Sequence, residues 1–210
     1  SDRESKPWLS VIIPTLNEAS SIANTIHSVQ QNPGVEIIVV DGGSSDATVQ
    51  RARKLGATIV ESEPGRGRQL ARGVEQAQGD VLLFLHADTL LAFGYVDEIS
   101  RILKRPNVVA GAFRLAFDQA NASLRLIQWG ANLRSIWGRM PYGDQGIFMH
   151  RSTYERVGGF RPLDAMEDFD LVWRLRRLGR VGISRLPATS SARKYTSQGP
   201  FRTVVRHQWI

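Results

Sequence analysis

The sequence has 210 residues, no cysteine and a formal net charge of +7. This length suffices for one domain with a full core, and the lack of cysteine excludes disulfides and thiolate chemistry and favours a cytoplasmic protein. No apolar run is long enough to cross a bilayer. The basic surplus suits nucleic acid, anionic lipid or phosphate-bearing ligands, and equally a solvated basic face.

The first half alternates short apolar runs with amphipathic segments. Strands are expected at Leu9–Ile13, Val35–Val40, Ala57–Val60 and Val81–Leu85. Helices are expected around residues 22–29, 49–55, 70–77 and 96–103. Near-continuously apolar strands are buried on both faces. The pattern therefore predicts an α/β fold, with a Rossmann-like, mostly parallel sheet flanked by helices in three layers, α/β/α.

The second half is less regular. We expect, in chain order, a strand at Val108–Phe117, a helix at Ala122–Ile136, a strand at Gly146–His150, a helical turn at Arg151–Val157, a helix at 167–178 and an edge strand at Val181–Leu186. No repeat or linker interrupts the chain, so residues 1–210 are predicted to form one domain. Its nucleotide-binding half would span about 9–105 and its acceptor and catalytic half about 106–210.

Two acidic sites, far apart in the chain, carry most of the functional information. His86-Ala87-Asp88 follows an apolar strand, where an acid could hold a metal ion against a diphosphate. Glu167-Asp168 opens a helix, where an acid facing the same cleft could take a proton. Acids in a first helical turn also complement the helix dipole without any catalytic role. In a parallel sheet, however, ligands bind beyond the carboxyl ends of the strands, where Asn17, Asp41 and Asp88 all fall.

Several common catalytic motifs are missing. The turn after the first strand, Pro14–Glu18, has no glycine, and the chain has no P-loop, no pair of histidines at zinc spacing and no Gly-x-Ser-x-Gly elbow. These absences disfavour a dinucleotide-binding oxidoreductase, a P-loop NTPase, a zinc site and an α/β-hydrolase. Gly143–Gly146 suits either a plain turn or a contact to a sugar. For Trp129, Trp137 and Tyr142, core packing is favoured over stacking on a sugar ring.

Five blocks of the sequence together resemble the family 2 glycosyltransferases with the GT-A fold. They are Ser10–Glu18, Val39–Thr48, Gly65–Gln69, His86–Asp88 and Glu167–Leu171. The similarity is greatest to small, single-domain bacterial members that carry His-Ala-Asp where the family usually has Asp-x-Asp. The resemblance implies an inverting enzyme that uses a nucleotide-diphosphate sugar and a bound Mg²⁺ or Mn²⁺.

The resemblance also implies residue roles. Pro14, Thr15, Asn17 and Glu18 would line the nucleoside pocket, Asp41 would accept a hydrogen bond from the base, Arg66 and Arg68 would lie near the phosphates, Asp88 would ligate the metal, and Asp168 would be the catalytic base with Glu167 beside it. His86 replaces an acid of the family pattern, so a metal site that includes it would bind weakly or favour Mn²⁺. His207 could be a further ligand, although an exposed histidine is the simpler interpretation.

The sequence therefore predicts sugar transfer to an unidentified hydroxyl acceptor, with no nucleic-acid partner. Two alternatives remain open. A sugar-nucleotide nucleotidyltransferase would need a Gly-rich loop after the first strand, and a basic nucleic-acid binder would need an RNA-binding or zinc-finger signature, and neither is found. The tail Lys194–Ile210 mixes aromatic and basic residues, so it could rest on the inner face of an anionic membrane and reach a lipid-linked acceptor. Nothing in the sequence indicates the oligomeric state.

Overall fold

The structure is a computed structural model that describes residues 6–119, 122–138, 140–141, 143–161, 163 and 166–192. Tyr142, His207 and the tail Lys194–Ile210, and the side chain of Trp137, lie outside what it describes. Within the described ranges, one eight-stranded sheet has the order β3-β2-β1-β4-β7-β6-β8-β5. The strands are β1 Leu9–Thr15, β2 Val35–Asp41, β3 Thr58–Glu61, β4 Val81–Phe84, β5 Thr89–Leu91, β6 Val108–Phe117, β7 Ile147–His150 and β8 Arg180–Ser190.

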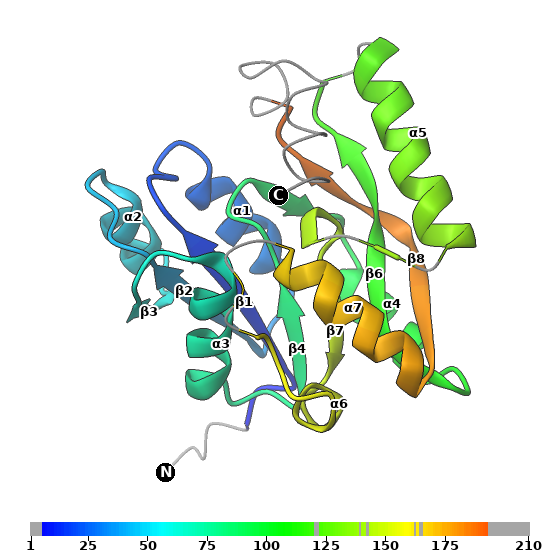
Figure 1. The fold of residues 1–210 in the computed structure, drawn as a ribbon. Coiled ribbons are helices and arrows are strands. Elements are labelled where there is room, and N and C mark those ends of the chain that lie inside the picture. The colour runs from blue at the N-terminus through cyan, green and yellow to red at the C-terminus, as the bar shows by residue number, and fades with distance from the viewer. Residues whose placement is uncertain are drawn as a thin grey trace.

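Helices cover both faces of this sheet (Figure 1). They are α1 Ile22–Val29, α2 Thr48–Lys54, α3 Arg66–Gln76, α4 Tyr95–Leu103, α5 Ala122–Trp137, α6 Arg151–Arg156 and α7 Glu167–Leu178, with a 3₁₀ turn, η1, at Gly143–Gln145. One core cluster joins one face of the sheet to α1, α2 and α4, and a second joins the opposite face to α3, α6 and α7. The predicted three-layer α/β/α arrangement is therefore confirmed.

The apolar strands are buried on both faces, as their sequences predict. Within β1, Val11 and Ile13 point into the first cluster and Ile12 into the second. Strands β3, β2, β1 and β4 pair in parallel, and β6 pairs in parallel with β8, while β7 is antiparallel to both β4 and β6. The carboxyl ends of β1, β2 and β4 consequently meet at one edge of the sheet.

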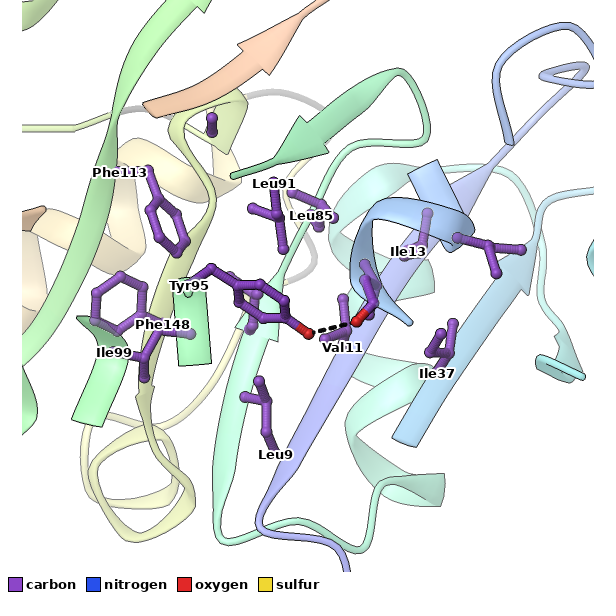
Figure 2. Close-up of a cluster of buried hydrophobic side chains, with 14 of the residues drawn as sticks. Leu9, Val11, Ile13, Ile37, Leu85, Leu91, Tyr95, Ile99, Phe113 and Phe148 are labelled. Atoms are coloured by element: carbon purple, nitrogen blue, oxygen red, sulfur yellow. Dashed lines mark hydrogen bonds between the residues drawn. The ribbon is translucent and has the colours of Figure 1, made fainter. Parts of the chain in front are cut away.

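The first cluster is centred on a buried tyrosine of α4. Tyr95 is fully buried, and its hydroxyl donates a hydrogen bond to the backbone oxygen of Val29, 2.8 Å away, at the end of α1 (Figure 2). Phe113 and Phe148 pack beside it with ring centroids 5.2 Å apart. The tyrosine therefore satisfies a helix-terminal carbonyl while filling the core.

The sequence expectations about the second half hold only in part. Among the described residues, Val181–Leu186 pairs with β6 alone, as expected of an edge segment, but β8 continues to Ser190, and its last residues Ala188–Ser190 pair with β5, the outermost strand of the sheet. Trp129 does not pack in a core, because its side chain is 62% exposed on α5. Among the residues with described structure, no helix is both long and apolar enough to span a membrane.

Candidate functional site

An open pocket of about 160 Å³ lies where β1, β4 and α3 converge. Its lining residues come from the end of β1 and the loop after it, the first turns of α3 and the segment after β4: Pro14, Thr15, Leu16, Glu18, Arg66, Gln69, His86 and Ala87. Gln69 ties these elements together, because its Nε2 donates to the backbone oxygens of Thr15 at 2.9 Å and Val40 at 2.8 Å. The sequence did not single out this glutamine.

Arg66, the first residue of α3, joins the pocket to the start of α7. Its Nε donates to Oε1 of Glu167, its Nη2 lies 3.9 Å from Oδ2 of Asp168, and its Nη1 lies 3.1 Å from Nε2 of His86. Burial alone would lower the pKa of Arg66, but the charges of Glu167 and Asp168 outweigh it and raise the pKa. Arg66 is therefore a permanent cation between two acids that are 101 and 102 residues away in the chain.

Glycines in α3 allow this close approach. A Cβ on Gly67 would lie 3.3 Å from both the Arg161 oxygen and the Cβ of Glu167, and a Cβ on Gly73 would lie 2.4 Å from Cγ2 of Ile12. The first contact places the start of α3 directly against the start of α7, and the second lets α3 pack tightly on β1. The glycines therefore set the distance between the pocket and the acidic pair.

Asp168 is held in a fixed orientation beside the pocket. Its Oδ2 accepts a hydrogen bond from the backbone N–H of Gly143 at 2.6 Å, and its Oδ1 accepts one from Phe169 at 2.8 Å. A Cβ on Gly143 would lie 3.0 Å from that Oδ2 and 3.1 Å from Nε2 of His86. Gly143 thus lies between the two predicted acidic sites, and the structure brings together His86, Arg66, Glu167 and Asp168.

Asp144, next to this glycine, is a further acid of the site. Its Oδ1 is buried and has no hydrogen-bond partner in the described part of the chain. Burial, and then the charge of Asp168, raise the pKa of Asp144 to about 6, against the opposing effects of Arg134 and Arg66. The sequence marked this segment only as a turn or a sugar contact, because a buried carboxylate leaves no spacing signal.

Asp170, in the same helical turn as Asp168, has a different environment. Its Oδ2 accepts hydrogen bonds from Nη2 of Arg174 at 2.6 Å and from Nε at 2.9 Å. Arg174 also donates to the backbone oxygens of Val157 and Gly159, at 2.6 and 2.8 Å. This carboxylate therefore orients Arg174, which anchors α7 to the loop after α6.

The predicted base-binding acid, Asp41, is enclosed by its own loop. Oδ1 accepts hydrogen bonds from the hydroxyls of Thr15 at 3.0 Å and Ser44 at 2.5 Å, and Oδ2 accepts from the N–H groups of Gly43 at 3.0 Å and Ser44 at 2.8 Å. Asp41 is 5% exposed and is not among the residues that line the pocket. The geometry shows a carboxylate that organises the β2–α2 loop, and its contact with a base stays a prediction.

The other predicted nucleotide-binding residues divide into two groups. Pro14, Thr15, Glu18 and Arg66 line the pocket. Asn17 supports the neighbouring loop, because its Oδ1 accepts from the Ser45 N–H at 2.9 Å. Arg68 lies outside the pocket, half-exposed, with Nη1 3.4 Å from Oε2 of Glu63.

The residues after β4 fit a metal site only in part. Asp88 is 7% exposed, and among residues with described positions no group of three or more His, Cys, Asp or Glu side chains could enclose a metal ion. His86 directs Nε2 toward the Arg66 cation, which disfavours a metal at that nitrogen. One carboxylate together with diphosphate oxygens and water is a usual set for Mg²⁺, so Asp88 alone fits an ion that arrives with its nucleotide.

The fold is GT-A-like, and the sequence comparison gives the family. The profile described as "Glycosyl transferase family 2" matches residues 10–166. The chain therefore belongs to glycosyl transferase family 2, a family of nucleotide-sugar-dependent glycosyltransferases.

Individual relatives are similar to this chain at modest identity. Glycosyltransferase AglE of Haloferax volcanii is 38% identical over 187 residues, which cover 81% of this chain and 61% of that protein. The mannosyltransferase PcManGT of Pyrobaculum calidifontis, in complex with GDP-Man and Mn²⁺, superimposes with a TM-score of 0.66 at 21% identity, covering 89% of this chain and 56% of that one. Glucosyl-3-phosphoglycerate synthase of Mycobacterium tuberculosis, with Mn²⁺, UDP-Glc and phosphoglyceric acid, gives a TM-score of 0.64 at 24% identity, covering 85% and 69%. The chain thus spans only about three fifths of the length of the two archaeal proteins.

Proposed function

We propose that the chain transfers a sugar from a nucleotide-diphosphate donor to a hydroxyl acceptor with inversion at the anomeric carbon. The observation that carries this is the Asp168 carboxylate, held at 2.6 Å by the Gly143 N–H beside a pocket at the strand ends. A carboxylate fixed in this way, and only 13% exposed, is placed to act as a general base. The UDP-Glc and GDP-Man of the relatives supply the class of donor.

In the proposed reaction, Asp168 takes the proton of the acceptor hydroxyl as its oxygen attacks the anomeric carbon. The bond from that carbon to the diphosphate breaks on the opposite side, and its electron pair leaves with the nucleoside diphosphate. Gly143 keeps the carboxylate aimed through its N–H. Glu167 is assigned a positioning role, because its side chain is 4% exposed and is bound by Arg66.

The charge at the site supports a divalent ion bound together with the donor. Asp144, Glu167 and Asp168 surround one guanidinium, Arg66, and Asp88 follows His86 in the chain. This excess of carboxylates would repel a diphosphate that arrived without a cation. Mg²⁺ or Mn²⁺ held by Asp88 would neutralise the negative charge that develops on the leaving diphosphate.

The test combines donor binding with turnover. Melting temperatures of the protein with UDP-, GDP-, dTDP- and CDP-linked sugars, with and without Mn²⁺, identify the donor, because a ligand of the folded state raises the midpoint. With that donor, we expect Asp168→Asn to keep the rise in melting temperature and to lower the rate of sugar release to acceptor or water about 10²–10⁴-fold. Asp97→Asn, an exposed acid in the first turn of α4, is the matched control.

Two results would contradict the assignment. Unchanged turnover in Asp168→Asn would remove this residue from the base role. We expect Asp88→Ala to lose the part of the donor-induced shift that depends on Mn²⁺. An equal Mn²⁺ effect in Asp88→Ala and the parent would remove Asp88 as the metal ligand.

A further inference from the structure

Helix α5 presents an apolar stripe to the outside of the molecule. Leu126, Trp129, Leu133 and Ile136 recur at helical spacing, and their side chains are 66%, 62%, 40% and 44% exposed. Figure 1 shows α5 at the outer margin of the fold, beside β6. The inner face of the helix buries Leu124 and Ala131, but these four larger apolar side chains point outward.

The reversed orientation is fixed by polar contacts on the inner face. Asn132 accepts a hydrogen bond from the Leu115 N–H at 2.9 Å and donates one to the Leu115 oxygen at 3.0 Å. Gln128 accepts from the Phe117 N–H at 3.3 Å. These amides satisfy backbone groups of β6, so α5 cannot rotate to bury the stripe without leaving those groups unpaired. The exposure is therefore built into the packing of the helix.

The charge around the stripe identifies what could cover it. Helix α5 itself carries two basic residues, the exposed Arg125 and the part-buried Arg134, and no acid. The chain carries +7, so a second copy would be repelled, whereas each basic residue near an anionic bilayer gains about 1 kcal/mol. Leucine and tryptophan on one face with arginines beside them are typical of helices that lie in a membrane interface.

The C-terminal half of α5 is coupled to the candidate site. The Ser135 hydroxyl donates to Oε1 of Gln145 at 2.7 Å, and Gln145 Nε2 donates to the Phe113 oxygen at 3.1 Å. Gln145 belongs to η1, whose first residue, Gly143, binds Asp168. A partner bound to the exposed face of α5 would therefore lie beside η1, the segment that orients the proposed base.

We propose that the α5 stripe docks the protein on an anionic lipid bilayer. The helix would lie in the interface, with Trp129 and Leu133 among the acyl chains and Arg125 at the headgroups. This inference does not depend on the proposed reaction, because the docking needs neither donor nor metal.

Sedimentation with vesicles tests the proposal on the full chain. We expect the protein to bind vesicles of 70% phosphatidylcholine and 30% phosphatidylglycerol and to bind pure phosphatidylcholine much more weakly. Trp129→Ser/Leu133→Ser should lower the partition coefficient at least about ten-fold, because two large apolar side chains are lost. Phe93→Ser, at an 81% exposed position before α4, should bind like the parent.

The controls separate the alternatives. Thermal melting checks that the double variant is folded, and Leu126→Gln provides a second, milder change with the same expected direction. No binding to the anionic vesicles, or binding that the α5 variants retain, would overturn the proposal. A dimer seen by light scattering that Trp129→Ser/Leu133→Ser dissolves would also overturn it, because the occupant would then be a second copy.

Discussion

Replacing Arg66 by glutamine tests whether the site is held together by charge. In the parent, the guanidinium contacts Glu167, which is 4% exposed, and lies 3.9 Å from Asp168. Removing one partner of a buried pair costs about 3–5 kcal/mol, because the remaining charge is buried alone. The Arg66 side chain is 34% exposed, so water can partly replace it, and we expect a smaller loss of stability, about 2–3 kcal/mol.

Urea unfolding of four proteins measures this quantity. The parent, Arg66→Gln, Glu167→Gln and the double variant form a double-mutant cycle, in which contacting residues typically couple by about 0.5–3 kcal/mol. We expect the double variant to be more stable than the sum of the single effects predicts, because it leaves no unpaired carboxylate at position 167. Additive single effects would refute the pairing and would leave Arg174, through its hydrogen bonds to the backbone oxygens of Val157 and Gly159, as an anchor of α7.

Three further predictions concern stability. Burial raises the native pKa of Asp144 from 3.8 to about 6, so this carboxyl destabilises the fold increasingly as pH rises from about 4 to 6. Asp144→Asn should therefore be more stable than the parent at pH 8, by up to ~3 kcal/mol. The gain in stability should vanish below pH 4. The pKa of Glu98 is shifted in the opposite direction, because its hydrogen bond from Arg101 outweighs the effect of burial and lowers the pKa from 4.5 to about 2. The contribution of Glu98 to stability is therefore full above pH 4.5 and is lost toward pH 2. Glu98→Gln should lower the free energy of unfolding by about 1–2 kcal/mol at pH 7 but by little at pH 2. Tyr95→Phe should cost about 1–3 kcal/mol in thermal or urea unfolding, because the buried Val29 carbonyl loses its donor; an unchanged midpoint would contradict that role.

The sequence predicted what local patterns encode. Strands β1, β2 and β4 are apolar on both faces and end near their expected positions, because burial on both sides leaves a continuous signal. Strand β5 was missed because its three residues are too few to show a period. That omission also hid the end of β8, because Ala188–Ser190 pairs with a partner from elsewhere in the chain.

The candidate site divides in the same way. The two acidic motifs could be found from the sequence, because His86-Ala87-Asp88 follows a strand and Glu167-Asp168 opens a helix. The contact between Arg66 and Glu167 could not, because it spans 101 residues and depends on how closely α3 approaches α7. Trp129 was misassigned because the pattern of α5 gives two faces, and only the hydrogen bonds of its amide side chains to β6 decide which one points inward.

The charge arrangement links the fold to the proposed chemistry. Arg66 belongs to both the pocket and the acidic pair, so the cation nearest the expected phosphates already serves two carboxylates. The two carboxylates repel a diphosphate that approaches this guanidinium, and a divalent ion held at Asp88 would reduce that repulsion. Donor and metal should therefore bind as one unit. Mn²⁺ should raise the melting temperature of the protein more when the donor is present than when it is absent.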